Sequence, residues 1–202
     1  MIVGAVVLAG GKSERMGQNK LLLCLNGKTL IETNLDALTA AGINDQVVVL
    51  GHRLEDIVEV IKPRLGRVKL ALNVDYEKGM VSSFQTGLIV ISNVEAAFLV
   101  LGDQPIIDPK LLTAMIQKME TSGALIVNPI HNGKKGHPLL FSRQLFGEIM
   151  TLKDTQTIRD IVYAHADRLV TVEAPSWVTV DIDTPVDYKR ISDLIKTGAW
   201  PP

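Results

Sequence analysis

The sequence predicts an α/β protein: a single-domain, three-layer αβα sandwich built on a Rossmann-like, mostly parallel sheet. Aliphatic residues are gathered in short blocks, which is typical of strands that a parallel sheet buries on both faces. Segments with helical spacing of apolar residues alternate with these blocks, as a doubly wound sheet requires. Apolar residues form 47% of the chain and aromatic residues only 4%, which fits such a protein. We expect one domain over residues 1–202, with a loose tail at residues 198–202.

The composition excludes several classes of protein. A formal net charge of −1 disfavours a nucleic-acid partner, which would normally require a basic excess. Because no apolar run approaches the roughly 20 residues of a membrane span, we expect no membrane partner. Cys24 is the only cysteine, so an intramolecular disulfide is impossible, and a reducing cytoplasm is favoured. Its neighbours Leu23 and Leu25 predict that Cys24 is a small packing residue.

Cap and stop signals divide the first half of the chain into elements. Residues 2–8 are apolar and too few for a helix of usual length, so they predict the first strand. Thr29 and Glu32 form a capping box at the start of a helix that Gly42 ends. Ser82 is expected to cap a later helix. The further elements predicted are a brief strand at 21–25 and strands at 46–50, 68–72 and 96–101. A helix is predicted at 54–62, and the helix that Ser82 caps is predicted to run to residue 91.

The second half continues the same alternation. Asp108 and Pro109 supply the cap and the first-turn proline of a helix that Gly123 ends. Asp154 is expected to cap a short helix, and Pro185 to open the last one. The elements predicted are strands at 124–127, 139–141, 169–172 and 178–182, short helices from about residues 143 and 155, and a helix through residue 194.

A glycine-rich, basic loop follows the first strand. Gly10 and Gly11 allow a sharp turn that exposes backbone N–H groups, while Arg15 and Lys20 add positive charge. A strand that ends in such a loop is typical of a polyphosphate site in an α/β protein. A P-loop would need a glycine where Val6 stands, and the glycine spacing does not fit a dinucleotide fingerprint.

Two later segments place aspartates where predicted strands end. Asp103 follows the strand at 96–101, and Asp181 and Asp183 lie at the end of the strand predicted at 178–182. Ligands of open α/β sheets bind at the carboxyl ends of the strands, and Mg²⁺ prefers one or two carboxylates together with phosphate oxygens. Asp103 alone would more simply be a cap or a turn former. Two such carboxylates beside a polyphosphate loop favour a metal site instead.

Residues 8–20, LAGGKSERMGQNK, resemble the opening signature of the nucleotidyltransferases that attach a nucleotide to molybdopterin. These are the molybdenum cofactor cytidylyltransferases and guanylyltransferases, whose wider relatives include sugar-nucleotide pyrophosphorylases. The resemblance implies the nucleotidyltransferase type of sheet and an enzyme. The family positions in this segment are held by Gly11, Arg15, Met16, Gly17 and Lys20. The resemblance implies catalytic roles for Arg15, Lys20 and Asp103, and nucleotide binding by Leu8, Ala9, Gly10, Gly11, Arg15 and Lys20.

Three further segments extend the resemblance over nearly the whole chain. Residues 79–88 resemble a family stretch close to the nucleotide base, which implies nucleotide contacts for Gly79, Ser82 and Ser83. Residues 136–138 resemble the family's loop on the acceptor side, which assigns acceptor binding to Gly136, His137 and Pro138. The family's aspartates in G-D-x-P and D-x-D-T-P hold a metal, which implies that Asp103 and Asp183 bind Mg²⁺. For Asp181 a metal role and a plain solvent contact remain equally open.

The resemblance implies that an NTP and molybdopterin are joined with release of pyrophosphate. The first loop, with glycine at position 10, follows the guanylyl pattern. Leu21-Leu22 and residues 80–83 and 102–105 follow the cytidylyl pattern, so CTP is favoured. Transient contact with a molybdoenzyme or its chaperone is a further expected partnership. The alternatives are a GTP-using enzyme, a nucleotidyltransferase for a sugar or another small metabolite, and a molybdopterin carrier without chemistry. A carrier could lose Arg15 or either aspartate, and this chain keeps all three.

Overall fold

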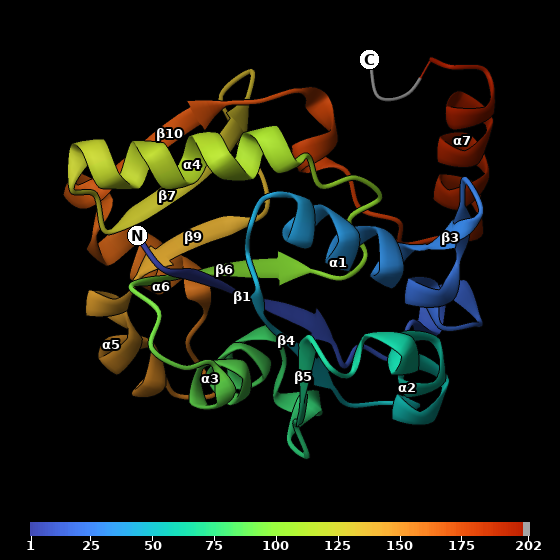
Figure 1. Ribbon diagram of the computed structural model, residues 1–202, viewed down its shortest axis with the longest axis horizontal. Helices are drawn as coiled ribbons and strands as arrows, with labels where there is room; N and C mark the ends of the chain where they lie inside the picture. The colour runs from blue at the N-terminus through green and yellow to red at the C-terminus, as the bar shows by residue number, and fades with distance from the viewer. Residues whose placement is uncertain (200–202) are drawn as a thin grey trace.

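A mostly parallel sheet forms the centre of the computed structural model, which describes residues 1–199. It is 8-stranded, with the order β10-β7-β9-β6-β1-β4-β5, and β8 pairs with β7 (Figure 1). β9 runs antiparallel to its two neighbours, whereas β1 pairs in parallel with both β4 and β6. The strands are β1 (Val3–Ala9), β4 (Asp45–Leu50), β5 (Val68–Leu72), β6 (Ala96–Leu101), β7 (Ile126–His131), β8 (Lys134–Lys135), β9 (Leu139–Ser142) and β10 (Leu169–Glu173).

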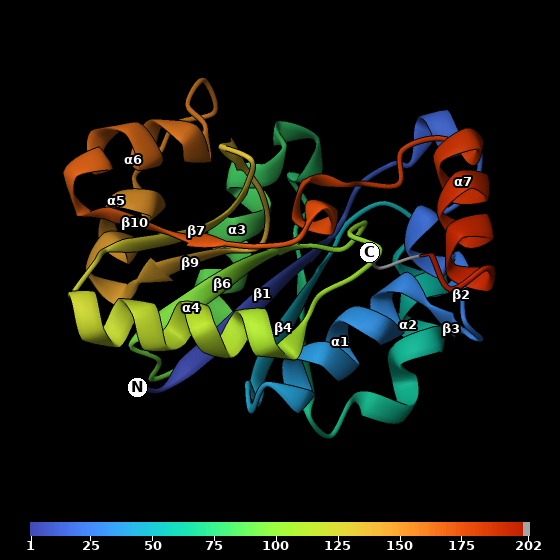
Figure 2. The same ribbon diagram turned by 90° about the horizontal axis from the view of Figure 1, so that it is seen from above.

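Helices cover both faces of the sheet, which confirms the predicted three layers (Figure 2). Val7 of β1 packs into one core, whereas Val6 packs into the other, because successive side chains of a strand point to opposite faces. The first core is covered by α1 (Leu30–Ala40), α2 (Leu54–Ile61) and α4 (Pro109–Ser122). The second is covered by α3 (Met80–Val90), α5 (Phe146–Met150) and α6 (Ile158–Ala164).

Several local predictions are confirmed residue by residue. The Thr29 hydroxyl accepts a hydrogen bond from the Glu32 backbone N–H, and the Glu32 carboxylate accepts one from the Thr29 backbone N–H. Asp108 caps α4, and Gly123 ends it with a φ of 64°, a left-handed conformation that suits glycine. Met115 and Met119 of α4 are buried in the core.

A third, smaller cluster stands beyond the carboxyl end of β1. It joins α7 (Pro185–Lys196) to the hairpin of β2 (Cys24–Leu25) and β3 (Lys28–Thr29), at the right of Figure 1. The Tyr188 hydroxyl donates a hydrogen bond of 2.8 Å to the Cys24 carbonyl. The cluster therefore holds the C-terminal segment beside the glycine loop. Its buried members are Met16, Leu23, Leu25, Leu30, Ile182 and Ile191.

Residues 178–182 do not form the predicted strand. Residues 176–179 instead form a 3₁₀ turn, η7 (Ser176–Thr179), and both Trp177 and Val178 are buried in the core under α1 and α4. Two consecutive buried side chains fit a helical turn, because a strand would point them to opposite faces. The C-terminal aspartates therefore follow a turn and not a strand.

Other boundaries differ from the prediction for local reasons. α3 begins at Met80, after Gly79, so Ser82 lies inside the first turn and is not the cap. Thr157, with the Asp160 carboxylate, caps α6 in place of Asp154. Residues 20–22 form a 3₁₀ turn, η2 (Lys20–Leu22), ahead of β2, and β7 starts at residue 126 and runs to residue 131.

Cys24 is exposed, which corrects its prediction as a packing residue. The sequence argument failed because the neighbours of a strand residue point to the opposite face.

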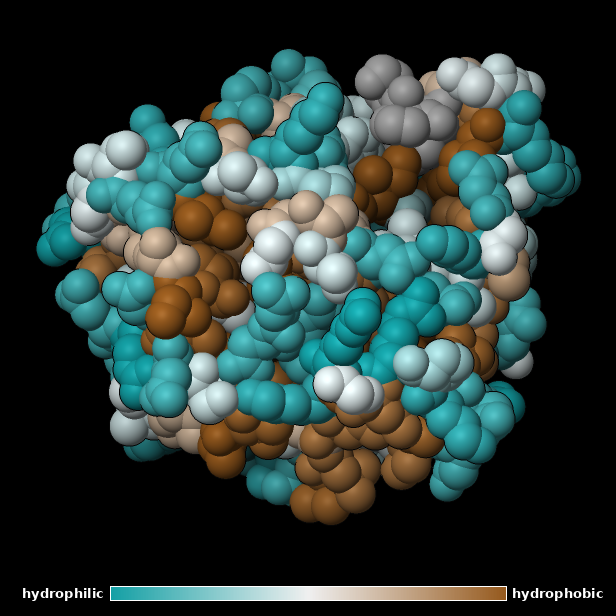
Figure 3. Space-filling model, in the orientation of Figure 1, coloured by the Kyte–Doolittle hydropathy of each residue, from teal (hydrophilic) through white to brown (hydrophobic). Residues whose placement is uncertain are grey.

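Hydrophilic residues, coloured teal, dominate the face seen in Figure 3, and hydrophobic residues, coloured brown, gather along its lower edge. Among the described residues, none of the helices has the length and apolar character that a membrane span requires. The predicted tail at 198–202 lies partly outside the described residues, which end at residue 199.

Candidate active site

The glycine loop leaves the end of β1 and opens onto a cleft. A Cβ added at Gly10 would lie 3.3 Å from the Gly51 nitrogen and 3.5 Å from the Cβ of Tyr76, so a side chain there would be crowded. A Cβ added at Gly11 would meet nothing within 4 Å, so the backbone here faces open space. Further along, the Ser13 hydroxyl accepts a hydrogen bond of 3.2 Å from the Lys20 backbone N–H and closes the loop.

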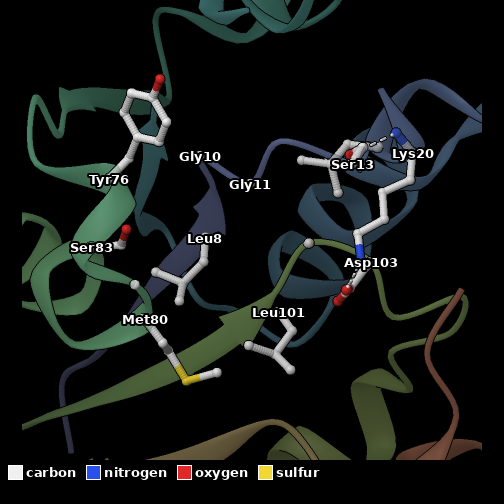
Figure 4. A pocket seen from close by; sticks show the side chains of 13 residues that line it. Leu8, Gly10, Gly11, Ser13, Lys20, Tyr76, Met80, Ser83, Leu101 and Asp103 are labelled. Carbon is white, nitrogen blue, oxygen red and sulfur yellow. Dashed lines mark hydrogen bonds and ion pairs between the residues drawn. The ribbon is translucent and has the colours of Figure 1, made fainter. Parts of the chain in front are cut away.

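The first cleft has a volume of about 220 Å³ and is named the nucleotide cleft after the ligand that the resemblance implies. Figure 4 shows the apolar side chains of Leu8 and Leu101 between its two walls. Tyr76, Met80 and Ser83 form one wall, from the start of α3 and the loop before it. The opposite wall is charged and includes Lys20 and Asp103. An apolar surface beside a charged wall suits a ligand with a flat ring and phosphates.

Four charged side chains from three distant segments meet at this wall. The Lys20 ammonium contacts one oxygen of Asp103 and lies 3.0 Å from Oδ1 of Asp183. The Arg15 guanidinium lies 2.9 Å from Oδ2 of the same Asp183. The side chains of Lys20 and Asp103 are only 17% and 18% exposed, so solvent screens this pair less than a surface pair. The predicted catalytic residues and metal ligands therefore lie together.

Backbone contacts explain how the two aspartates reach the same place. Gly102 leaves no room for a side chain, because an added Cβ would lie 2.6 Å from the Leu8 carbonyl oxygen. The buried Asn34 side chain donates a hydrogen bond of 3.1 Å to the Gly102 carbonyl and holds this turn. The Asp103 carbonyl then accepts a bond of 3.3 Å from the Ile182 N–H. This last bond ties the C-terminal segment to the end of β6 and positions Asp183.

The charges shift one another's titration. Burial alone would lower the pKa of Lys20, but Asp103 and Asp183 outweigh it and the pKa is raised. Hydrogen bonding from Lys20 lowers the pKa of Asp183, with a further contribution from Arg15. The pKa of Asp181 is raised to about 6, first because the surrounding chain displaces water from its carboxylate and then because Asp103 and Asp183 repel its charge. Asp181 as a whole residue is nevertheless exposed to solvent, which weakens the effect of burial on its carboxylate.

The carboxylates of Asp103 and Asp183 fit a divalent cation such as Mg²⁺. Both turn an oxygen towards the same ammonium, so their negative charge converges on one point beside the glycine loop. Within residues 1–199, no cluster of three or more His, Cys, Asp or Glu residues could hold a metal. Two protein carboxylates with the remaining positions left to phosphate and water are the usual arrangement for Mg²⁺.

A second, larger cleft adjoins the first at Gly79 and Met80 and measures about 550 Å³. It is named the acceptor cleft after the role that the resemblance implies for Gly136 and His137, which line it. His137 lies in its wall, and burial lowers the pKa of this imidazole to about 4. Its backbone carbonyl accepts a hydrogen bond of 3.0 Å from the side chain of Gln104, the residue after Asp103. This hydrogen bond directly joins the turn that contains Asp103 to the loop that contains His137. Basic side chains at this cleft are Lys78, Lys135 and Arg159.

Most of the predicted site residues line these clefts, and three do not. The Ala9 side chain is buried in the core, and Pro138 is buried beside the acceptor cleft without lining it. The Ser82 hydroxyl donates to the carbonyls of Asp75 and Gly79, so it stabilises the loop. The predicted residues that line the nucleotide cleft are Leu8, Gly10, Gly11, Lys20, Gly79, Ser83 and Asp103. Arg15 and Asp183 line a further opening, which adjoins this cleft at the glycine loop. Gly136 and His137 line the acceptor cleft.

Sequence reasoning missed several residues of the site. Asn34 stands among apolar residues on the buried side of α1. A polar side chain at such a position is unusual, and this could have indicated from the sequence that Asn34 has a structural role. Tyr76 lies in the short turn before α3, where no pattern in the sequence indicated a ligand contact. Met80 belongs to the stretch 79–88 that the resemblance places near the base, but it was not itself predicted to contact the nucleotide. For Arg159 no local signal exists, because an exposed arginine on a helix normally faces solvent.

The chain is similar to a known protein family and to several named proteins. The model of the MobA-like NTP transferase domain matches residues 5–169. A probable molybdenum cofactor guanylyltransferase from Natranaerobius thermophilus is 34% identical over 137 residues, which are 65% of this chain and 62% of that protein. The molybdenum cofactor cytidylyltransferase of Escherichia coli K12 is 26% identical over 187 residues, 92% of this chain and 93% of that protein.

Solved structures share the whole architecture. A nucleotidyl transferase from Methanothermobacter has a TM-score of 0.81 at 27% identity, covering 97% of this chain and 99% of that one. A Mycobacterium tuberculosis H37Rv protein in complex with manganese has a TM-score of 0.78 at 26% identity, covering 96% and 99%. The predicted resemblance is thus confirmed at the level of the family. With its glycine loop and converging carboxylates, the chain belongs to the MobA-like NTP transferase family and carries a nucleotidyltransferase domain.

Proposed function

We propose that the protein transfers CMP from CTP to molybdopterin, with release of pyrophosphate and dependence on Mg²⁺. The observation that carries this proposal is the convergence of Lys20, Asp103 and Asp183 where the glycine loop meets the end of β6. The named relatives act on molybdenum cofactor and on nucleotides, which supports the same pair of substrates. We further propose a cytoplasmic location and transient contact with a molybdoenzyme or its chaperone.

The reaction needs positioning and neutralisation of charge more than proton transfer. A phosphate monoester has a second pKa of about 6, so the acceptor phosphate is mostly a dianion at neutral pH and needs no general base. The difficulty is to bring this dianion against the negative triphosphate. Arg15, Lys20 and the N–H groups of Gly10 and Gly11 would face the triphosphate and stabilise the charge that develops on pyrophosphate.

Asp103 and Asp183 would hold Mg²⁺, which supplies a positive charge shared between the reacting phosphates. Manganese in the related mycobacterial structure supports a divalent metal in this family. The buried Asn34 and the bond between Asp103 and Ile182 keep the carboxylates in place without taking part in the chemistry. The protein's contribution is therefore a pair of carboxylates held beside the cations Lys20 and Arg15.

The acceptor would bind in the acceptor cleft, which meets the nucleotide cleft beside Met80. Lys78, Lys135 and Arg159 outnumber Asp154, the one acidic residue that lines the cleft, so its net charge is positive and suits an anionic acceptor. His137 stays neutral at physiological pH because its pKa is about 4, so it would contact the acceptor as a neutral imidazole. A molybdopterin phosphate could then reach the carboxylate pair while its ring system occupies the larger volume.

The choice between CTP and GTP depends in part on the wall that faces Gly10. The missing methyl leaves room between Gly10 and Tyr76 that a purine could use, so this position by itself favours GTP. CTP is proposed because residues 21–22, 80–83 and 102–105 follow the cytidylyl pattern. A methyl at position 10 would press on Tyr76 and Gly51. GTP is the second candidate, because the guanylyltransferase relative has the higher identity of the two.

Pyrophosphate release tests the proposal directly. It should be measured with CTP, GTP, ATP and UTP, with and without molybdopterin and with and without Mg²⁺. We expect release that requires molybdopterin and Mg²⁺ and has the highest kcat/KM with CTP. A preference for GTP would overturn the nucleotide assignment, and a change in that preference in Gly10→Ala would show that the first loop determines it. Release that is independent of molybdopterin but dependent on a sugar phosphate would overturn the acceptor assignment, and no release with any acceptor would favour a carrier.

A further inference from the structure

The Lys20 ammonium occupies the point at which the two carboxylates converge. It contacts Asp103 and Asp183 together, while Arg15 contacts only the second oxygen of Asp183. Lys12 of the same loop pairs with Glu77 at 2.6 Å and makes no ion pair with either carboxylate of this cluster. One lysine of the loop is therefore committed to the carboxylate pair, and the other is committed to a different acid.

The Lys20 ammonium and a divalent cation cannot both occupy the point between the two carboxylates, because like charges repel strongly where screening is weak. Lys20 would have to leave when such a cation binds. If it left with no other anion nearby, a partly buried ammonium would lose its partners, which is costly. A triphosphate in the nucleotide cleft supplies the missing anion, since Lys20 lies in the wall of that cleft.

The chain around Lys20 is built for such an exchange. Its backbone N–H is fixed by the Ser13 hydroxyl and its residue begins the turn η2, so the Cα stays in place. Its side chain is a flexible four-carbon stem, which can turn from the carboxylates to the phosphates without movement of the loop. The backbone bond between Asp103 and Ile182, the residue before Asp183, holds the two chain segments together, so neither has to move in this exchange.

We propose that Lys20 occupies the place of the divalent metal until a nucleoside triphosphate draws its ammonium away, so that metal and nucleotide bind cooperatively. This inference rests on the proposed function, because it takes Asp103 and Asp183 as metal ligands. Coupling between two ligands is reciprocal, so the metal must raise nucleotide affinity by the same factor. Lys20 thereby prevents a metal from settling in the site without its substrate.

Mn²⁺ binding to the full-length protein tests the proposal without any turnover. Free Mn²⁺ is followed by electron paramagnetic resonance, with and without the non-hydrolysable α,β-methylene analogues of CTP and GTP. In the wild type we expect Mn²⁺ to bind at least about tenfold more tightly when an analogue is present. In Lys20→Met we expect Mn²⁺ to bind more tightly than in the wild type when no analogue is present. The factor of cooperativity should fall below that of the wild type, to the part that phosphate oxygens contribute as metal ligands.

Matched variants keep the result interpretable. Lys12→Met removes a loop lysine that does not touch the carboxylates, and it should bind Mn²⁺ as the wild type does. Lys20→Arg keeps the charge and should keep the cooperativity, and thermal melts verify that each variant is folded. Equal Mn²⁺ affinity with and without an analogue in the wild type, or unchanged affinity in folded Lys20→Met, would overturn the proposal while pyrophosphate release could still stand. Unchanged Mn²⁺ binding in Asp103→Asn with an analogue present would overturn the metal site itself, and with it that part of the proposed function.

Discussion

The nucleotide cleft and the acceptor cleft adjoin at Gly79 and Met80 but are assembled in different ways. The loop of the nucleotide cleft is one continuous run directly after β1, and its charged wall contains a lysine whose pKa is raised by two carboxylates. The acceptor cleft is assembled from the start of α3, the β8–β9 connection and α6, and its central histidine is neutral. A compact loop next to a central strand can be recognised from its residues, whereas a cleft shared by distant segments depends on how they pack.

Asp103 provides the strongest test of how the two clefts cooperate, because it lines the nucleotide cleft and adjoins the turn bound to His137. Asp103→Asn and Asp183→Asn should each lower the single-turnover rate with Mg²⁺ at least about a hundredfold, since charge compensation in the transition state is worth several kcal/mol. Thermal melts should remain close to those of the wild type. Asp167→Asn, at an exposed position elsewhere, is the matched control. Near wild-type rates in both active-site variants would show that the metal assignment is wrong.

A low pH should destabilise the protein through His137, which lies in the acceptor cleft. Its pKa of about 4 lies below the usual 6.5, so the folded protein holds it neutral while the unfolded chain takes up a proton below pH 6.5. Its contribution to stability is therefore complete above pH 6.5 and is lost as the pH falls towards 4, by no more than about 3 kcal/mol. Melting temperatures of wild type and His137→Gln between pH 7.5 and 4.5 measure this. The variant should lose less stability over that range, with His52→Gln as a control. Parallel curves for wild type and His137→Gln would contradict it.

Removal of the loop cations should affect nucleotide use selectively. Lys20→Ala and Arg15→Ala should raise the KM for CTP more than the KM for molybdopterin, because charge-assisted contacts to phosphate are worth about 1.5–3 kcal/mol each. The larger effect is expected for Lys20, since the Arg15 side chain is 70% exposed. Steady-state kinetics with each substrate varied in turn gives both constants. If neither variant changed the KM for CTP, both cations would be ordinary solvated side chains.

The acceptor cleft should show the converse pattern with a smaller effect. Arg159→Ala should raise the KM for molybdopterin and leave the KM for CTP unchanged. The loss of binding free energy should be about 1 kcal/mol, because an exposed arginine makes only a modest charge-assisted contact. Lys118→Ala, on the outer side of α4, controls for a general loss of positive charge. A rise in the KM for CTP instead would mean that the two clefts have been assigned to the wrong substrates.

The nucleotide side of the site could be predicted because its signals are local. The apolar run of β1, the two glycines and the following cations are contiguous, and the backbone needs of a tight turn restrict which residues can stand there. The alternation of strands and helices and several caps could be predicted for the same reason, since Thr29 with Glu32 and Asp108 with Pro109 act within one helical turn. The resemblance extended this to Asp103 and Asp183.

Only the tertiary structure decided how the distant pieces meet. The segment predicted as a last strand became a 3₁₀ turn because Trp177 and Val178 are both required by the core, and the hydrogen bond from Ile182 to Asp103 then brought Asp183 to Lys20. The position of Arg159 at the acceptor cleft likewise follows from how α6 packs. Burial and pairing between residues far apart in the chain are properties of the packed state, and no local pattern contains them. The sequence by itself therefore determined the class of fold and the residues of the glycine loop, and packing determined which charges face one another.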